Sequence, residues 1–407
     1  MTTAPALPLG FNHLALANLA AQSAEQISLA AVPIVAVMLL GAGAGEVGLL
    51  ATAQTLPFLL LSIPLGLMAD RLSRRRLMVA AELLRALALL GLAAMAVSGQ
   101  VSLLGLAVLG FLGSAGTVGF SVTAPALVPS LVPRESLGAA NGRLELARSV
   151  AFAGGPAVAG ALVAAAGAPG AFALATALSA AAVLLLWRLH EPARVLAPRR
   201  HPWVELRQGA ATVWHHPLLK PILLTAVAWN TAWFVLQAAY VPYAMRSLGL
   251  DAAAVGFTLA GYGVGMVIGA LLAARLIRSV RYGQAVILGP AVSVLAALVM
   301  VASIVWPSGW LAGASFFLFG IGPIIWTISS TTLRQHVTPG PLLGRVSAIF
   351  LTTNMGARPL GAALGGWIGT HHGLAACLLV AAGGFVVQLV LIVASPVRTL
   401  QHLPEPA

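Results

Sequence analysis

Long runs of apolar residues dominate the chain, and Gly, Pro or clusters of charge separate one run from the next. Most runs reach the length of about 20 apolar residues that a helix needs to cross a bilayer. The runs lie at about residues 13–40, 47–69, 77–97, 101–124, 143–166, 170–188, 218–245, 251–275, 284–305, 309–333, 345–368 and 373–395. The pattern therefore predicts an all-α membrane protein with 12 transmembrane helices.

A polar interval after residue 188 separates two sets of six predicted helices. We expect three parts, which are an N-terminal six-helix half at 1–188, a cytoplasmic linker at 189–217 and a C-terminal six-helix half with a short cytoplasmic tail at 218–407. A weak repeat supports this division, because Ala69 and Arg71 recur as Ala273 and Arg275, both 204 positions later. Transporters built from two related halves bind their substrate between the halves, near the middle of the bilayer.

The composition agrees with a membrane protein and excludes several other classes. Of the 407 residues, 59% are hydrophobic and 8% are charged, whereas a soluble globular chain is about 25% charged. Cys377 is the only cysteine, so an intramolecular disulfide and a cysteine metal cluster are excluded. The adjacent His371 and His372 have no acidic or thiol partner nearby in the sequence, so we expect no metal site there.

The net charge of +12 would suggest a nucleic-acid partner in a soluble chain. If the predicted helices alternate in direction, however, the basic residues outside them lie on one side of the membrane, and Arg246 alone lies on the other. The positive-inside rule then places both termini and the linker in the cytoplasm. We therefore expect a multi-pass protein of a bacterial-type inner (plasma) membrane and no nucleic-acid partner.

The loop after the second predicted helix carries a distinctive motif. It resembles the signature cytoplasmic loop of the major facilitator superfamily, with Met68 and Ser73 departing from that pattern. The positions that fit are Gly66, Ala69, Asp70, Arg71, Arg74 and Arg75. The resemblance implies a conformational latch, formed by these residues, that biases the inward-facing against the outward-facing state. The alternative is that the arginines only anchor the loop at the anionic membrane surface.

Two further stretches resemble particular branches of this superfamily. Gly155, Pro156 and Gly160 resemble a motif of the drug and proton antiporters, although ordinary packing of small residues is the alternative. Ser23, Glu25 and the Ala-x-x-Pro pattern that ends at Pro33 are similar to the enterobactin-exporter-like branch. A basic residue in the fourth predicted helix, which many proton-driven relatives carry, is absent.

Glu25 lies about halfway along the first predicted helix, where a charge is expensive and therefore a candidate for function. Asn18, Gln22 and Gln26 share its helical face by their spacing of three and four residues, and such a face suits a central cavity. Removal of a carboxyl from water disfavours its charged form, which suits proton coupling. Glu25 is therefore a candidate for proton coupling or substrate contact, or for a fixed ion pair with Arg358 or Arg148.

Two other acidic residues each have an arginine three positions later, namely Glu82 with Arg85 and Glu145 with Arg148. Residues at this spacing meet on one helix, so we interpret both pairs as structural. Arg358 has no acid within four residues and could neutralise Glu25 or bind an anionic substrate.

A polar and aromatic face in the seventh predicted helix could line a cavity for an aromatic solute, or could instead serve as an interfacial belt or in helix packing. Its members are Trp229, Asn230, Trp233, Gln237 and Tyr240. In the eleventh predicted helix, Asn354 and Arg358 share a face.

The favoured interpretation is a proton-coupled exporter of small amphipathic molecules, of the drug or siderophore type, that works by alternating access as a monomer. Its expected partners are the lipid bilayer, a small-molecule substrate and protons. Uptake of a small polar solute is the alternative within transport, and a polytopic membrane enzyme or a sensor is the alternative of another class. No catalytic residue and no cofactor are predicted, and a nucleotide-binding loop of the G-x-x-x-x-G-K-[ST] kind is absent from the sequence.

Overall fold

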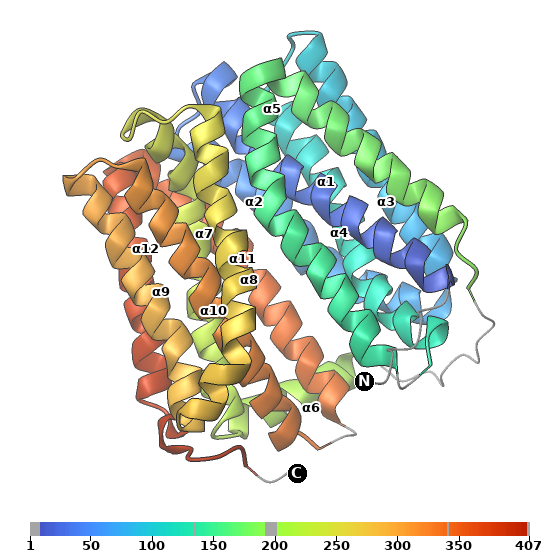
Figure 1. The fold of residues 1–407 in the computed structure, drawn as a ribbon, viewed down its shortest axis with the longest axis vertical. Coiled ribbons are helices and arrows are strands. Elements are labelled where there is room, and N and C mark those ends of the chain that lie inside the picture. The colour runs from blue at the N-terminus through green and yellow to red at the C-terminus, as the bar shows by residue number, and fades with distance from the viewer. Residues whose placement is uncertain (1–8, 134–135, 192–201, 340–341, 405–407) are drawn as a thin grey trace. The chain divides into compact units, whose positions relative to one another are not determined.

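The computed structural model describes residues 9–133, 136–191, 202–339 and 342–404, which form helices and no strand (Figure 1). The helices are α1 (Leu9–Leu40), α2 (Ala44–Arg71), α3 (Arg74–Val97), α4 (Leu103–Leu131), α5 (Leu137–Trp187), α6 (Pro202–His215), α7 (Leu219–Arg246), α8 (Ala252–Ser279), α9 (Tyr282–Val305), α10 (Gly309–Val337), α11 (Leu343–His372), α12 (Leu374–Val393) and the 3-10 helix η3 (Pro396–Thr399).

Within the described ranges, 10 helices are long and apolar enough to cross a membrane. The 12 predicted segments differ from these 10 in two places. The two segments 143–166 and 170–188 lie on either side of Gly167 within α5, and the helix is interrupted there, because φ is +71° and ψ is −177°. The segment 345–368 lies in α11, which is less apolar because it contains Asn354 and Arg358. With α5 counted as two crossings and α11 included, the predicted fold class is confirmed.

The chain contacts define two compact units. The first holds α1, α2 from Ala53 onward, α3, α4, α5 and the start of α8 as far as Gly256. The second holds the start of α2 as far as Thr52, followed by α6, α7, the rest of α8 and all later helices. The predicted boundaries at residues 188 and 217 stay a prediction.

In the first unit, α1 packs along α5, and α3 packs against both α4 and α5. One buried cluster joins four of these helices, because Phe11 of α1 gathers with Met78 of α3, Phe120 of α4 and Leu186 of α5. The helices of this unit are therefore held by a continuous apolar core.

In the second unit, α7 packs against α11 and α12, and α9 contacts both α10 and α12. Cys377 of α12 is fully buried, and its thiol donates a hydrogen bond to the carbonyl oxygen of Gly365 in α11 at 3.2 Å. The thiol is thus part of the packing between these two helices.

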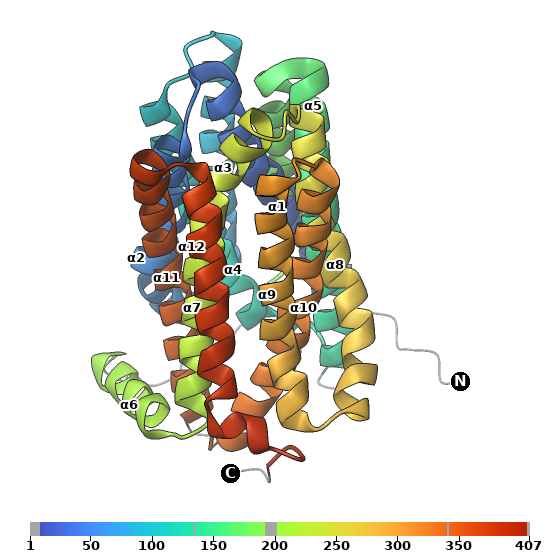
Figure 2. The ribbon, with the colours of Figure 1, turned by 90° about the vertical axis from the view of Figure 1, so that its left-hand side faces the viewer.

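Part of the predicted linker is the helix α6, which lies across the ends of α7 and α11 (Figure 2). Val213 is buried, and the backbone at Gly209 lies against that of Arg345 at the start of α11. The ammonium group of Lys220 lies 4.3 Å from the ring centroid of Trp214. The end of the linker is therefore fastened to the second unit.

Glycines set the separation of α8 and α10 in the second unit. A Cβ atom on Gly320 would collide with the carbonyl oxygen of Tyr262 and lie 2.7 Å from the amide nitrogen of Met266. Both obstacles are backbone atoms of α8, so neither can move without the helix.

We expect Gly320→Ala to destabilise the protein by about 1–3 kcal/mol, because the added methyl group forces α8 and α10 apart. Gly383→Ala in α12 is the matched control, since a Cβ there has no heavy atom within 4 Å. Thermal unfolding of the purified variants in detergent measures the difference, and equal midpoints for the two variants would contradict this account of the packing.

Candidate functional site

A small pocket lies within the first unit between α1, α2, α3 and α4, and its volume of about 20 Å³ has room for about one water molecule. Its wall combines apolar side chains with a small number of polar ones. The polar lining residues are Glu25, Ser28, Gln54, Arg85, Ser114 and Thr117. Glu25, the first of the predicted site residues, therefore faces a polar pocket.

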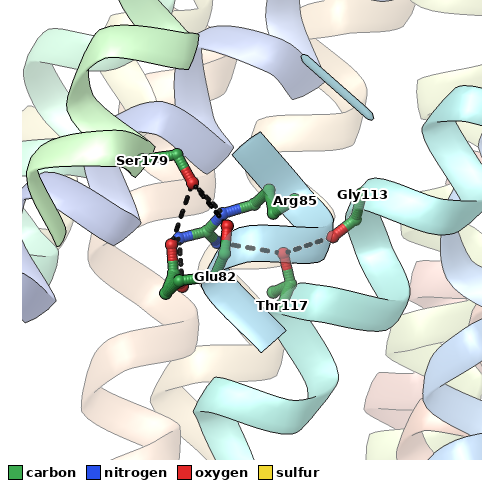
Figure 3. Close-up of polar contacts among 5 residues, drawn as sticks. All are labelled: Glu82, Arg85, Gly113, Thr117 and Ser179. Carbon is green, nitrogen blue, oxygen red and sulfur yellow. Dashed lines mark hydrogen bonds and ion pairs between the residues drawn. The ribbon is translucent and has the colours of Figure 1, made fainter. Parts of the chain in front are cut away.

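Arg85 and Glu82 of α3 form the ion pair that their spacing predicts, and the pair is buried (Figure 3). The Nη2 atom of Arg85 lies 2.5 Å from each carboxylate oxygen of Glu82. Ser179 of α5 donates to Glu82 at 3.0 Å and accepts from the Nε atom of Arg85 at 3.5 Å. Thr117 of α4 accepts from Nη1 of Arg85 at 3.1 Å. Three helices thus share one polar network.

Small residues on α4 make this network possible. A Cβ on Gly116 would collide with the carbonyl oxygen of Ala81 and lie 3.0 Å from the Cβ of Arg85. A Cβ on Gly119 would lie 2.8 Å from that of Ala81. Because α3 and α4 approach so closely, the guanidinium of Arg85 reaches across to Thr117.

The predicted polar face of α1 divides between two environments. Asn18 donates a hydrogen bond to the carbonyl oxygen of Leu144 at 3.2 Å, and Gln26 packs against Gly155. Both contacts are with α5, whereas Glu25 lines the pocket. Gln22 is partly exposed.

In the second unit, two residues that the sequence singled out separately are joined. The Nε atom of Arg358 donates to the Oδ1 atom of Asn230 at 3.2 Å, and the guanidinium lies 5.7 Å from the ring centroid of Phe234. The amide nitrogen of Asn230 donates in turn to the carbonyl oxygen of Ala226 at 3.0 Å. Asn230 of α7 therefore orients the guanidinium of Arg358 in α11.

The aromatic residues of this face have different environments. Trp229 stacks on Trp233 with ring centroids 5.3 Å apart. Trp233 is 8% exposed and contacts Tyr262, Phe316 and Phe319, so it belongs to the core.

Two buried polar atoms near this face stand out. The Nε1 atom of Trp229 and the Oδ1 atom of Asn354 have no hydrogen-bond partner in the described part of the chain. Gln237, further along α7, is half-buried. Because a buried polar atom without a partner is unfavourable, Trp229 and Asn354 are suited to contact a ligand or water.

The motif after α2 is held by an acidic residue that the sequence analysis did not select. Glu191 accepts hydrogen bonds from Ser73 at 2.5 Å and from the backbone amides of Arg74 and Arg75 at 3.0 and 3.1 Å. A carboxylate suits this place, because the first turn of α3 presents unpaired amides and the positive end of the helix dipole. The position of Glu191, just beyond a long apolar segment, was the signal that could have indicated it.

The other motif residues have different environments. The guanidinium of Arg74 also donates to Ala126, and that of Arg75 to Trp187 and Leu189, all within the first unit. Arg71 is exposed, and Gly66 has open space where a Cβ would lie. The side chain of Asp70 lies outside the described residues.

The motif of Gly155, Pro156 and Gly160 in α5 lies where the backbones of neighbouring helices come close together. A Cβ on Gly160 would collide with the carbonyl oxygen of Ala252, and one on Gly256 with that of Pro156. A Cβ on Gly155 would collide with the Cβ of Gln26 in α1. The three motif residues therefore contact the start of α8 and the middle of α1.

Helices that are long and apolar enough to cross a membrane, with a buried ion pair of Glu82 and Arg85 between them, define a polytopic membrane protein. The family model of the Major Facilitator Superfamily matches residues 14–362, and the chain belongs to that superfamily. The predicted family is thereby confirmed, and this superfamily comprises transporters of small molecules.

Relatives and solved structures agree with this assignment. The chain is 29% identical over 345 residues to the enterobactin exporter EntS of Salmonella typhimurium, covering 83% of this chain and 81% of the relative. It is 28% identical over 306 residues to EntS of Escherichia coli O1:K1, covering 75% of this chain and 72% of the relative. A bacterial homologue of the iron transporter ferroportin, in an inward-facing state, has a TM-score of 0.76 at 17% identity and covers 96% of this chain and 99% of its own. This last likeness shows the fold.

We expect Glu82→Gln to destabilise the protein by about 3–5 kcal/mol, because it leaves the buried guanidinium of Arg85 without its counter-charge. The double variant Glu82→Gln with Arg85→Gln should recover most of that loss, since it removes both charges. Thermal unfolding in detergent compares the two, and a double variant that is less stable than the single one would contradict the pairing.

Proposed function

We propose that this transporter is a proton-coupled exporter of small amphipathic molecules of the siderophore type, working by alternating access. The observation that carries the proposal is the carboxyl of Glu25, which lies in a membrane-crossing helix and lines a polar pocket. Intramembrane carboxyl groups in such places commonly act in proton relays. The export direction is supported by the similarity to the enterobactin exporters.

The second unit offers groups suited to a catecholate siderophore. The guanidinium of Arg358, held by Asn230, provides a positive charge for acidic phenol oxygens. The ring of Trp229 provides an aromatic surface, and its Nε1 atom can donate a hydrogen bond to a ligand. Asn354 adds an acceptor, and we include Gln237 and Trp233 as neighbours on the same face of α7.

The same proposal covers the setting of the protein in the cell. It is a monomer of a bacterial inner (plasma) membrane with both termini in the cytoplasm, and protons are its coupling ion. The exposed Arg71 and the anchored Arg74 and Arg75 then face the anionic inner leaflet. Together with Gly66 and Asp70 they form the latch between the two facing states, while Gly155, Pro156 and Gly160 allow helices to pack closely during the change.

We expect substrate-triggered proton release from proteoliposomes under an imposed pH gradient, read with a pH-sensitive dye. Addition of a catecholate siderophore should start the release, and Glu25→Gln should abolish it, because the amide cannot carry the proton. Glu46→Gln is the matched control, since this exposed carboxylate lies at the start of α2 and accepts a hydrogen bond from the backbone amide of Gly43.

Proton release that persists in Glu25→Gln would contradict the role of Glu25. Siderophore movement only in the uptake direction would contradict export and favour the uptake of a solute.

For substrate binding, we expect Arg358→Gln to raise the Kd for a catecholate by about 10-fold to 100-fold, since a hydrogen bond to a charged group contributes about 1.5–3 kcal/mol. Arg358→Lys should retain part of the affinity because it keeps the charge. The exposed Arg398→Gln is the control. Isothermal titration in detergent gives the constants, and equal Kd values for Arg358→Gln and Arg398→Gln would exclude Arg358 from the site.

A further inference from the structure

The last turn of α10 carries an arginine that has no acidic partner among the described residues. This residue, Arg334, precedes the end of α10 at Val337. Its guanidinium carbon lies 4.8 Å from the ring centroid of Phe350 in α11. Its Nε atom is buried and has no hydrogen-bond partner in the described part of the chain, yet the residue as a whole is partly exposed. An aromatic ring therefore positions Arg334, and a ligand can still reach it.

The surroundings of Arg334 provide very little negative charge. Between residues 252 and 404 the sequence contains seven arginines and no Asp or Glu. The buried cluster that includes Phe350 also holds Leu333, Val337 and Val346. A guanidinium stays charged in proteins, and a charge beside apolar groups is unfavourable without a counter-charge. An anion is therefore the ligand that suits this position.

Phe350 lies on the same face of α11 as two residues of the proposed substrate site. Asn354 and Arg358 follow it at intervals of four residues, a spacing that places side chains on one face of a helix. The Oδ1 atom of Asn354 is buried and has no hydrogen-bond partner among the described residues. At the helical rise of 1.5 Å per residue, the levels of Phe350 and Arg358 are about 12 Å apart along α11.

The two arginines are positioned in a similar way at these two levels. Arg334 lies beside the ring of Phe350, and Arg358 lies 5.7 Å from the ring centroid of Phe234. Contact with an aromatic ring holds a guanidinium without neutralising its charge. Two positive groups are thus available along one polar face of the second unit.

Arg334 lies toward the side from which an exporter takes up its substrate. In the first turn of α11, Arg345 donates a hydrogen bond to Gln208 of α6, so α11 begins on the side where α6 lies. The proposed topology places that side in the cytoplasm. Since Arg358 is further along α11, a substrate that enters from the cytoplasm passes the level of Arg334 first.

We propose that Arg334 is a second anion-binding residue of the substrate site, and that the substrate carries at least two acidic groups. One acidic group binds Arg358 and the other binds Arg334, at levels about 12 Å apart along α11. A molecule with several catechol units has this chemistry, because each unit offers acidic phenol oxygens and an aromatic ring. The inference rests on the proposed function and narrows its substrate class to molecules with more than one anionic group.

The phosphate of an anionic phospholipid is the competing ligand, since arginines near a membrane surface attract such headgroups. The substrate is favoured, because Asn354 and Arg358 continue the polar face from Phe350 into the helix. A lipid phosphate that stays at the membrane surface would use Arg334 and leave these two residues without a ligand.

The test compares two ligands by isothermal titration of the full chain in detergent. One probe is a bis-catecholate whose two units can span about 12 Å, and the other is 2,3-dihydroxybenzoate, which has a single unit. We expect Arg334→Gln to raise the Kd of the bis-catecholate about 10-fold, because a hydrogen bond to a charged group is lost. The Kd of 2,3-dihydroxybenzoate should not change, whereas Arg358→Gln should raise both constants.

Arg345→Gln is the matched control, since it removes an arginine from the same side of the second unit and should leave both constants unchanged. Unchanged binding of 2,3-dihydroxybenzoate shows that Arg334→Gln is folded. If that variant unfolds in detergent, Arg334→Lys decides the question, with a smaller rise that is again confined to the bis-catecholate.

An unchanged Kd for the bis-catecholate in Arg334→Gln would overturn the second anion site, and so would an equal rise in Arg345→Gln. Native mass spectrometry with added phosphatidylglycerol tests the competing ligand. Loss of a bound lipid from Arg334→Gln, with the bis-catecholate affinity unchanged, would assign Arg334 to a lipid headgroup instead. Failure of both probes to bind the parent protein would overturn the proposed substrate class itself, which distinguishes that failure from the failure of the second site.

Discussion

A charged side chain in a membrane-crossing helix lies away from water, so other groups of the protein have to compensate its charge. The polar contacts in both units follow from this requirement. The first unit meets it by placing both carboxylate oxygens of Glu82 against one nitrogen of the Arg85 guanidinium, with hydroxyl groups from two further helices. The second meets it by placing Arg358 between an amide oxygen and an aromatic ring. The two arrangements differ because Glu82 supplies a full negative charge to Arg85, whereas Asn230 supplies a neutral amide oxygen to Arg358.

Close approach between helix backbones makes these arrangements possible. Gly116 allows α3 to come near enough to α4 for Arg85 to reach Thr117, and Gly320 does the same for the packing of α8 and α10. Small residues at such contacts are the usual means of association in a bilayer, where the hydrophobic effect between helices is weak. The many glycines of this chain are thus part of the reason that its few charges can be satisfied.

The number and order of the crossings could be predicted from the sequence, because apolar runs of fixed length report directly on the thickness of the bilayer. The interruption at Gly167 was also predicted, since it falls between the segments 143–166 and 170–188, whereas its positive φ angle follows only from the backbone. The ion pair of Glu82 and Arg85 followed from its spacing, whereas its contacts with Thr117 and Ser179 depend on the distance between helices. Spacing along α1 likewise grouped Asn18 and Gln26 with Glu25, although these two contact α5. Glu191 was not selected because the amides that it caps lie more than 100 positions earlier in the chain, and only its place just beyond a long apolar segment pointed to it.

The burial of Cys377 has a practical consequence for the study of motion. The only thiol of the chain is fully buried and occupied by a hydrogen bond to Gly365. Maleimide and methanethiosulfonate reagents react with exposed thiols, so we expect the unmodified chain to take up little of a spin label or fluorophore attached through them. Cysteines introduced in pairs, one in each unit, would therefore report distances between the units in a lipid bilayer without removal of the native residue.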